Sequence, residues 1–486
     1  MARRCDSTWF RYLLPLAFLV ACVMPVTAVL AQPAEDTPAA TGEVAGEDKG
    51  TDAVDAKDDA TQSNLSLDSI VNRHPEVKDV LKTLGQGEGK KALEELKALA
   101  AQHDDLPPGE VLLAIIYGAQ KPPQAYQAAH RQALEDAILA SPDDPDAYLM
   151  LAGVAVSQRR LAETDLLLNA AEKLVGSFAA NADRKQSMQL RYHTIRALLH
   201  EHRKQWKEAT AEWDSRLKLD DTAANVRYRY ARSLFHTGTK EARGKALEEA
   251  TKAYAQDDSV LKPYVAIALL YDENQSEDDP KTNAAKTKEW WVAAIQQYPK
   301  DSNTQLRYAQ WLWKQGDAEG VIRHAQSAVD LDEENVDAKF LLGLAMKNAE
   351  ELEKAEDLFV ECQKLRPDST AIRNHLALVR LDLGDATSTT MALSMARENF
   401  SKNQRDPFTT ATLGYILFKI GQREQGINAL KAVSRTRDSN IRFFLASVMV
   451  EVGDSEQAKA ILKQVLMGKA LFAYRSQAER LQSSLE

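Results

Sequence analysis

The chain has 486 residues, of which 44% are hydrophobic and 27% are charged, and its formal net charge is −10. This length allows several ordinary domains or one long array of repeats. Because nucleic-acid-binding proteins need clustered Lys and Arg, the acidic balance argues against that class. Arg227 and Arg229 lie among acidic residues, which predicts solvated helix faces.

The N-terminus has the features of an export signal. Basic residues precede an apolar stretch from Tyr12 to about Val26, and Val29 and Ala31 place small side chains where a signal peptidase cleaves. Pro15 and Pro25 interrupt this stretch, which is short for a membrane span of about 20 residues. We therefore expect a cleaved signal peptide at residues 1–31 and a periplasmic or extracellular protein, with an uncleaved anchor as the alternative.

A second form of processing is suggested by Leu19 to Cys22, which resemble the cleavage box of bacterial lipoproteins. Against it, the apolar run continues past Cys22, where lipoproteins usually become polar. Lipidation at Cys22, or an uncleaved signal, would give a membrane-anchored protein, and membrane contact is expected only in these two cases.

Cysteine usage indicates a fold without disulfides. Cys5 and Cys22 belong to the leader, so Cys362 is the single thiol of the expected mature chain. One thiol cannot form an internal disulfide, and packing must therefore stabilise the fold.

The segment after the signal, residues 32–64, contains nine Asp and Glu residues but only two Lys, and no aromatic residue. It cannot bury enough apolar surface to offset the entropy of ordering. We expect a disordered acidic linker here, acting as a solvated tether, with a dedicated binding tail as the alternative.

From Leu65 onward, apolar residues recur at spacings of three and four, the period of an α-helix, without the alternation of strands. Prolines stand between the periodic segments or in their first turns. The sequence therefore predicts an all-α protein. Residues 65–108 are expected to hold two helices, the second being EGKKALEELKALAAQH.

The helices come in repeating pairs. Small residues of the first helices align at Ala309, Gly343 and Ala377, each 34 residues apart. Second helices carry a small–large–small face at i, i+4 and i+7, for example Ala355/Phe359/Cys362. Such a face lets two helices approach closely while the large side chain fills the space between them.

The turns and ends of the pairs also repeat. Turns between paired helices carry Gly followed by a polar residue: Gly316-Asp317, Gly384-Asp385, Gly421-Gln422 and Gly453-Asp454. Glycine suits a helix C-terminus that needs a positive φ. Several pairs close on a proline: Pro142, Pro299 and Pro367.

This combination resembles the tetratricopeptide repeat (TPR) family, and Leu342-Gly343, Ala355, Phe359, Cys362 and Pro367 carry the resemblance best. The resemblance implies a right-handed α-solenoid of helix–turn–helix repeats. We expect about ten TPR-like repeats over residues 109–467 and a degenerate repeat or cap at 65–108. A C-terminal capping helix is expected at 468–486, where KALFAYRSQAERLQSSLE has an amphipathic pattern.

Residues with catalytic or metal-binding chemistry are present, but their spacing is not that of a site. His193 and His200 are seven residues apart, not the i, i+4 of a helical zinc site, and His200-Glu201-His202 lacks a completing ligand. Adjacent acids at Asp143-Asp144, Asp220-Asp221 and Asp278-Asp279 flank helix starts, where Asp caps free N–H groups. No phosphate-binding loop or nucleophile elbow is found. We predict no catalytic residue, no metal and no cofactor.

Cys362 stands in a column that is Ala in other repeats, so we expect it to pack as a small hydrophobe and not to react.

In TPR arrays the first helix of each pair lines a groove that usually contacts the partner. Carried over by register, this groove would present seven aromatic residues: Tyr228, Phe235, Trp313, Phe340, Tyr415, Phe418 and Phe443. Aromatic residues dominate binding energy at interfaces. The alternative is that these side chains form the core between repeats, because aromatic residues at helical spacing more often pack inside.

The resemblance thus implies a non-enzymatic scaffold of the cell envelope that holds protein or peptide partners in its groove. One alternative is an accessory subunit for the assembly or export of envelope polysaccharide or lipid. A second is a hydrolase with a degenerate site. Neither the partner nor the oligomeric state follows from the sequence.

Overall fold

The computed structural model describes residues 65–121, 123–274 and 280–486. Within these ranges the chain forms 24 helices and no strand, which confirms the all-α prediction. The predicted signal peptide (1–31), the predicted linker (32–64) and Asp278-Asp279 lie outside the described residues. Among the helices described, none has the length and apolar character that a membrane span requires.

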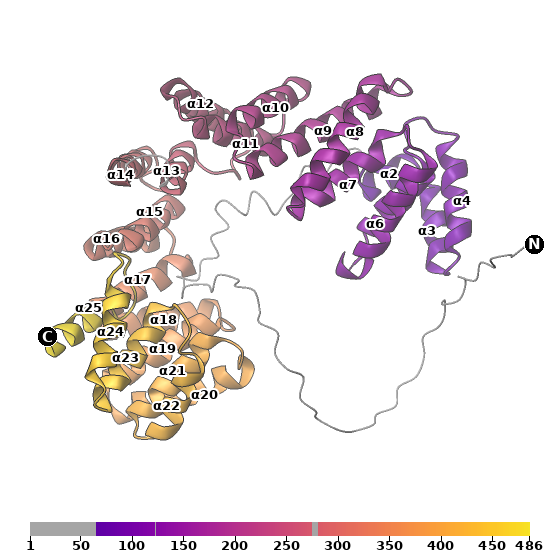
Figure 1. The fold of residues 1–486 in the computed structure, drawn as a ribbon. Helices are drawn as coiled ribbons and strands as arrows, with labels where there is room; N and C mark the ends of the chain where they lie inside the picture. The colour runs from indigo at the N-terminus through magenta and orange to yellow at the C-terminus, as the bar shows by residue number, and fades with distance from the viewer. Residues whose placement is uncertain (1–64, 122, 275–279) are drawn as a thin grey trace, which may run out of the picture. The chain divides into compact units, whose positions relative to one another are not determined.

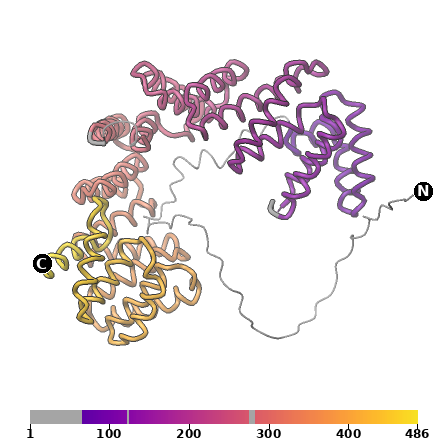
Figure 2. Tube along the Cα trace, viewed as in Figure 1, coloured from indigo at the N-terminus to yellow at the C-terminus, as the bar shows by residue number. Residues whose placement is uncertain are grey.

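Ten helix–turn–helix pairs follow one another along the chain, and the tube trace in Figure 2 shows their alternation. The first helices are α5 (Gly109–Gly118), α7 (Pro145–Ser157), α9 (Ala182–His202), α11 (Ala224–His236), α13 (Pro263–Glu273), α15 (Ser302–Gln315), α17 (Val336–Asn348), α19 (Thr370–Leu383), α21 (Pro407–Lys419) and α23 (Ser439–Glu451) (Figure 1). The second helices are α6 (Pro123–Ala140), α8 (Leu161–Ser177), α10 (Trp206–Leu219), α12 (Lys240–Gln256), α14 (Pro280–Gln297), α16 (Ala318–Leu331), α18 (Leu352–Leu365), α20 (Ala386–Lys402), α22 (Arg423–Ala432) and α24 (Ser455–Leu466). Each first helix packs most extensively on its own second helix, so the pair is the structural unit.

The N-terminal region contains three helices where the sequence predicted two: α2 (Leu67–Arg73), α3 (Val77–Gly85) and α4 (Gly89–Ala100). The prediction missed the break at residues 74–76, where the His74 N–H still donates to the Ile70 carbonyl before the chain turns. Helix α4, the one predicted from EGKKALEELKALAAQH, packs on α5. The N-terminal region therefore stacks directly onto the first pair.

The predicted Gly turns have the predicted backbone. Gly316, Gly384, Gly421 and Gly453 have φ values of 83°, 78°, 91° and 90°, the left-handed region in which only glycine is free of strain. An aspartate follows three of these glycines and accepts hydrogen bonds from the first turn of the next helix. In these three pairs the turn residues thus fix where the second helix begins.

The small–large–small faces of the second helices are buried. Phe359, Ala355 and Cys362 on α18 are all inaccessible to solvent. Gly343 on α17 allows α17 and α18 to approach closely, because a Cβ built there would lie 2.8 Å from Cε1 of Phe359. The small column of the first helices therefore makes room for the large residue of the second helices.

Cys362 has the packing role that the sequence predicted. Its side chain is completely buried, and Sγ lies 3.6 Å from the Val336 carbonyl oxygen. Burial raises the pKa of the thiol to about 12, so almost no reactive thiolate is present at neutral pH.

The first helices form the inner layer of the stack. Several successive first helices contact one another, as α19 does with α21 and α21 with α23. In the part of the chain that the structure describes, contacts between successive second helices are weaker or absent. A layer whose helices lie closer together is the inner side of a curved stack, so the first helices line that side.

Candidate functional site

The seven aromatic residues predicted to line a groove are all buried, with side chains at most 8% exposed. They are Tyr228, Phe235, Trp313, Phe340, Tyr415, Phe418 and Phe443. Each of the helices that carry them packs on its own second helix and on the second helix of the preceding pair, which leaves little of a bulky side chain accessible. The burial favours the core alternative, and contact of these residues with a partner stays a prediction.

The C-terminal residues explain part of this burial. We call residues 468–486 the C-terminal tail. It leaves α24, returns to the ends of α15 and α17, and finishes in α25 (Arg475–Leu485), as the yellow end of the chain shows in Figures 1 and 2. The tail therefore contacts first helices that lie more than one hundred residues earlier in the sequence.

The tail corrects one sequence expectation, because its helix begins at Arg475 and not near Lys469. Four consecutive residues before this helix are buried: Leu471, Phe472, Ala473 and Tyr474. The helix assignment itself begins only at Arg475, so these four residues reach the core from a non-helical stretch. The Leu471 N–H donates to the carbonyl oxygen of Trp313, 2.9 Å away, instead of to a carbonyl of its own helix.

Tyr474 is the central contact of the tail. Its ring stacks on Phe443 with centroids 5.0 Å apart and meets Phe444 edge-on at 5.2 Å. Tyr415 lies edge-on to the same ring at 6.5 Å. Tyr415 and Phe443, two of the seven predicted groove residues, therefore contact the tail of the same chain, and their contact with a partner stays a prediction.

A buried ion pair lies beneath Tyr474. Lys347 on α17 pairs with Asp382 on α19, and its ammonium nitrogen lies 4.0 Å from the centroid of the Tyr474 ring. Burial lowers the pKa of Lys347, and the Asp382 carboxylate opposes that shift. Burial also raises the pKa of Tyr474, with a further contribution from Asp382. The site thus combines aromatic side chains around Tyr474 with a buried ion pair beneath its ring.

We define the tail-docking surface as Trp313, Lys347, Asn348, Tyr415 and Phe443. Asn348 belongs to it because its Oδ1 accepts from both the N–H and the hydroxyl of Ser476, each at 3.2 Å. Lys347 and Asn348 were not among the residues predicted from the sequence. A lysine inside the otherwise apolar run FLLGLAMKN was the available signal.

The histidines singled out in the sequence are not brought together into a site. His193 bonds to Glu212 at 2.7 Å and His200 to Gln205 at 2.8 Å. Glu201 is buried and accepts from the Trp213 indole at 2.7 Å, which is a structural role.

A different cluster has the geometry of metal ligands: His74, His103 and Asp105. Here Oδ2 of Asp105 already accepts from Arg73 at 2.6 Å and contacts Nε2 of His74 at 2.9 Å. Because a guanidinium neutralises the carboxylate, this cluster fits a hydrogen-bonded ion pair better than a cation site.

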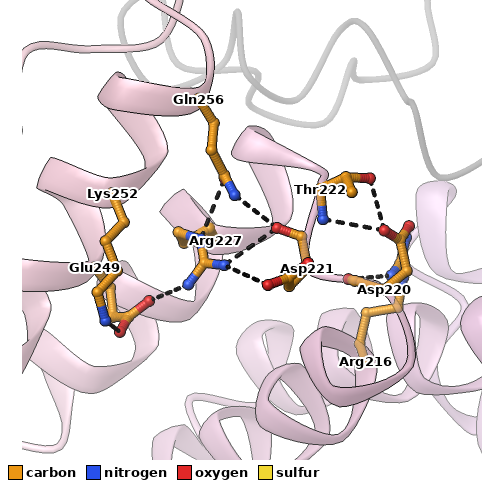
Figure 3. A network of polar contacts seen from close by, with 8 residues as sticks. All are labelled: Arg216, Asp220, Asp221, Thr222, Arg227, Glu249, Lys252 and Gln256. Atoms are coloured by element: carbon orange, nitrogen blue, oxygen red, sulfur yellow. Dashed lines mark hydrogen bonds and ion pairs between the residues drawn. The ribbon is translucent and has the colours of Figure 1, made fainter.

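The sequence predicted solvated helix faces for Arg227 and Arg229, and this prediction was wrong. Figure 3 shows Arg227 of α11 joined to Glu249 of α12 at 2.7 Å and to the Asp221 carbonyl at 3.1 Å. Arg229 pairs with the buried Glu201 at 3.2 Å. Both side chains are less than 15% exposed. They fasten neighbouring helices and do not form a basic surface.

The adjacent acids have local structural roles. Asp144 caps α7 by accepting from the N–H of Asp146, as predicted. Asp220 instead ends α10 and accepts from the N–H and hydroxyl of Thr222 (Figure 3). The start of α11 has Ala223 at its N-cap, so the capping prediction was wrong for Asp220-Asp221.

One surface recess lies where α4, α5 and α7 begin or end, and charged residues line it. Four of these charges are paired with each other, Lys97 with Glu110 at 3.2 Å and Arg184 with Asp144 at 2.7 Å, and Asp104 accepts from Asn181 at 3.2 Å. The polar groups of the recess thus bond to one another, which is a structural role.

No family model matches the sequence, and no curated protein matches it. Among solved structures, the chain is similar to YrrB, described as a TPR protein with an unusual peptide-binding site, at 17% identity and a TM-score of 0.26, covering 40% of this chain and 96% of that chain. It is similar to PilF of Pseudomonas aeruginosa at 15% identity and a TM-score of 0.31, covering 44% and 96%. Yeast Tom70 gives 14% identity and a TM-score of 0.32, covering 86% and 96%.

The fold assignment rests on the chain's own geometry. The described residues form ten helix pairs, a small column in the first helices faces large residues of the second helices, and five pairs have a left-handed glycine in the turn. The protein is a TPR-like α-solenoid.

Proposed function

We propose that this protein is a non-enzymatic scaffold that holds segments of partner proteins on the inner layer formed by its first helices. The observation that supports this function is the C-terminal tail, a peptide segment already seated on that layer. The tail is recognised through its backbone at Leu471 and through an aromatic side chain at Tyr474. A combination of main-chain hydrogen bonds and aromatic contacts is how peptides are commonly bound.

We further propose that the scaffold works outside the cytoplasm. The support is the N-terminal sequence alone, with its basic leader, apolar stretch and small residues before Gln32. The intact mass of the protein purified from the cell envelope tests this proposal. A mature N-terminus at Gln32 supports cleavage of a signal peptide, a lipidated N-terminus at Cys22 supports anchoring, and an intact Met1 contradicts both.

The partner-binding role is tested by site-specific crosslinking in the full chain. A photoreactive residue replaces Asn303, an exposed first-helix residue on α15, or Met391, an exposed second-helix residue on α20. The proposal expects a partner to crosslink from position 303 and not from position 391. Crosslinking only from the outer position, or from neither, would contradict binding to the inner layer.

A further inference from the structure

The tail covers charges that would otherwise be solvated. Lys347 is completely buried and Asp382 is largely covered, while the Tyr474 ring lies over the Lys347 ammonium. Removing an ion pair from water has a desolvation cost that opposes its own attraction. This cost works against tail docking, whereas the burial of Leu471, Phe472 and Tyr474 favours it. The opposing terms make the tail easier to displace than an equally buried, wholly apolar segment.

The scaffold is shaped to let a backbone approach at one point. Gly316 ends α15 with φ 83°, and a Cβ built there would lie 2.6 Å from the carbonyl oxygen of Lys469. Any side chain at this position would collide with the tail backbone. Next to this contact, the Trp313 carbonyl accepts the N–H of Leu471. Both contacts involve main-chain atoms of the bound segment, so other peptides could make them.

The remaining fastenings are polar and lie toward the outside. Ser476 donates twice to Asn348, and Arg480 pairs with Glu350, which follows α17. Met467 is 86% exposed, and the adjacent Gly468 is also exposed, so the connection to α24 lies at the surface, where Arg475 donates to the carbonyl oxygens of Gly468 and Ala470 at 2.8 Å and 2.9 Å. The tail is thus held by the buried side chains of Leu471, Phe472 and Tyr474 and by a few polar bonds, while an exposed connection tethers it to α24.

We propose that the C-terminal tail is an intramolecular occupant of the tail-docking surface, and that it is displaced by a partner segment of the same chemistry. That segment is a short non-helical apolar stretch whose tyrosine or phenylalanine stacks on Phe443 above the Lys347–Asp382 pair. This inference rests on the proposed function and adds the identity of the surface, the chemistry of the ligand and a means of regulation.

The test uses the full chain with a site-specific protease sequence inserted between Met467 and Gly468. The chain also carries Tyr474→Ala, which weakens the resident tail so that it dissociates after cleavage. A fluorescently labelled synthetic peptide of residues 468–486 with the natural Tyr474 is then added, and its anisotropy is measured. Before peptide is added, the helical circular dichroism of the cleaved chain should fall by no more than the contribution of α25, which unfolds on release because isolated helices this short are marginal. The added peptide should then bind saturably.

Variants of this peptide show which of its residues is responsible for binding. The peptide with Tyr474→Ala should bind at least about ten-fold more weakly, because a central aromatic anchor carries much of such an interaction. The peptide with Ser483→Ala should bind within about two-fold of the natural peptide, because Ser483 is exposed on α25. Equal binding of all three peptides would overturn the proposal.

Other results also overturn it. If the cleaved chain loses more helical signal than α25 contributes when the tail leaves, the tail is a structural cap and not a displaceable occupant. If the cleaved chain stays folded but binds no peptide, the surface does not recognise the tail in isolation. A concentration-dependent dimer of the uncleaved wild-type chain that Tyr474→Ala dissolves would place the tail on a second copy instead.

The proposed function and this inference can be refuted separately. A partner captured at position 303 that neither competes with the peptide nor depends on Phe443 would leave the scaffold function intact and overturn the inference. If the peptide binds but no partner is captured from either crosslinking position, the scaffold function is contradicted, while recognition of the tail by the surface is supported.

Discussion

The contact between Gly343 and Phe359 provides a quantitative test of the helix-pair geometry. Phe359 is completely buried, with ring centroids of Phe340 and His375 at 5.6 Å and 5.8 Å. Phe359→Ala should destabilise the protein by about 3–5 kcal/mol, the cost of truncating a buried Phe. We expect the upper part of this range, because helices on several sides of the ring prevent the cavity from collapsing.

The effect of Gly343→Ala on the free energy of unfolding should be destabilising in the wild-type chain and stabilising in the Phe359→Ala chain. In the wild-type chain the added Cβ would lie 2.8 Å from the Phe359 ring, and such overpacking costs about 1–3 kcal/mol. Part of this is offset, because Ala is better than Gly inside a helix by about 1 kcal/mol. In the Phe359→Ala background the ring is gone, so Gly343→Ala should stabilise by about 1 kcal/mol.

Urea denaturation followed by far-UV circular dichroism gives the free energies of unfolding for this double-mutant cycle. Because repeat arrays can unfold in parts, hydrogen exchange of α17–α19 provides a local readout. Leu365→Ala is the control, since Leu365 lies on the same helix but is 43% exposed and should change stability by about 0.5 kcal/mol or less. If Gly343→Ala had the same effect with and without the Phe359 ring, the close approach of α17 and α18 would be refuted.

Three further predictions concern the turns, the pH dependence and the thiol. Arg159 has φ 55° in a turn where other pairs have glycine, so Arg159→Gly should raise the free energy of unfolding by about 0.5–1 kcal/mol, whereas Gly453→Ala should lower it; denaturation midpoints check both. Burial, and to a lesser degree the charge of Lys347, lowers the pKa of His375 to about 3 from 6.5, so the unfolded chain binds more protons between these values. Stability should be full above about pH 6.5 and fall as the pH drops toward 3, by about 2 kcal/mol at pH 5 for this group; His375→Phe should flatten that slope, and an unchanged slope would contradict the assignment. Cys362 should react with a thiol reagent far more slowly in the native protein than in urea, and equal rates would show that it is accessible.

The repeat architecture could be predicted because its determinants are local or strictly periodic. The 34-residue spacing of Ala309, Gly343 and Ala377 and the glycine turns follow from the sequence alone. The same holds for the face formed by Ala355, Phe359 and Cys362. Helical period and turn conformation depend on near neighbours, so no distant contact is needed to infer them.

The candidate site could not be predicted, because its parts come from separate repeats and from the chain end. Nothing near Lys347 in the sequence indicates that Asp382 neutralises it or that Tyr474 covers it. The register did assign Tyr415 and Phe443 to the inner layer, but it could not show that the tail buries them.

The sequence by itself thus determined the helices, their pairing and the residues that close each pair. Only the tertiary structure decided which inner surface is occupied and by what. The curvature of the stack brings α15 and α17 within reach of residues 468–486, and such long-range proximity depends on the sum of many helix packings and not on any local pattern.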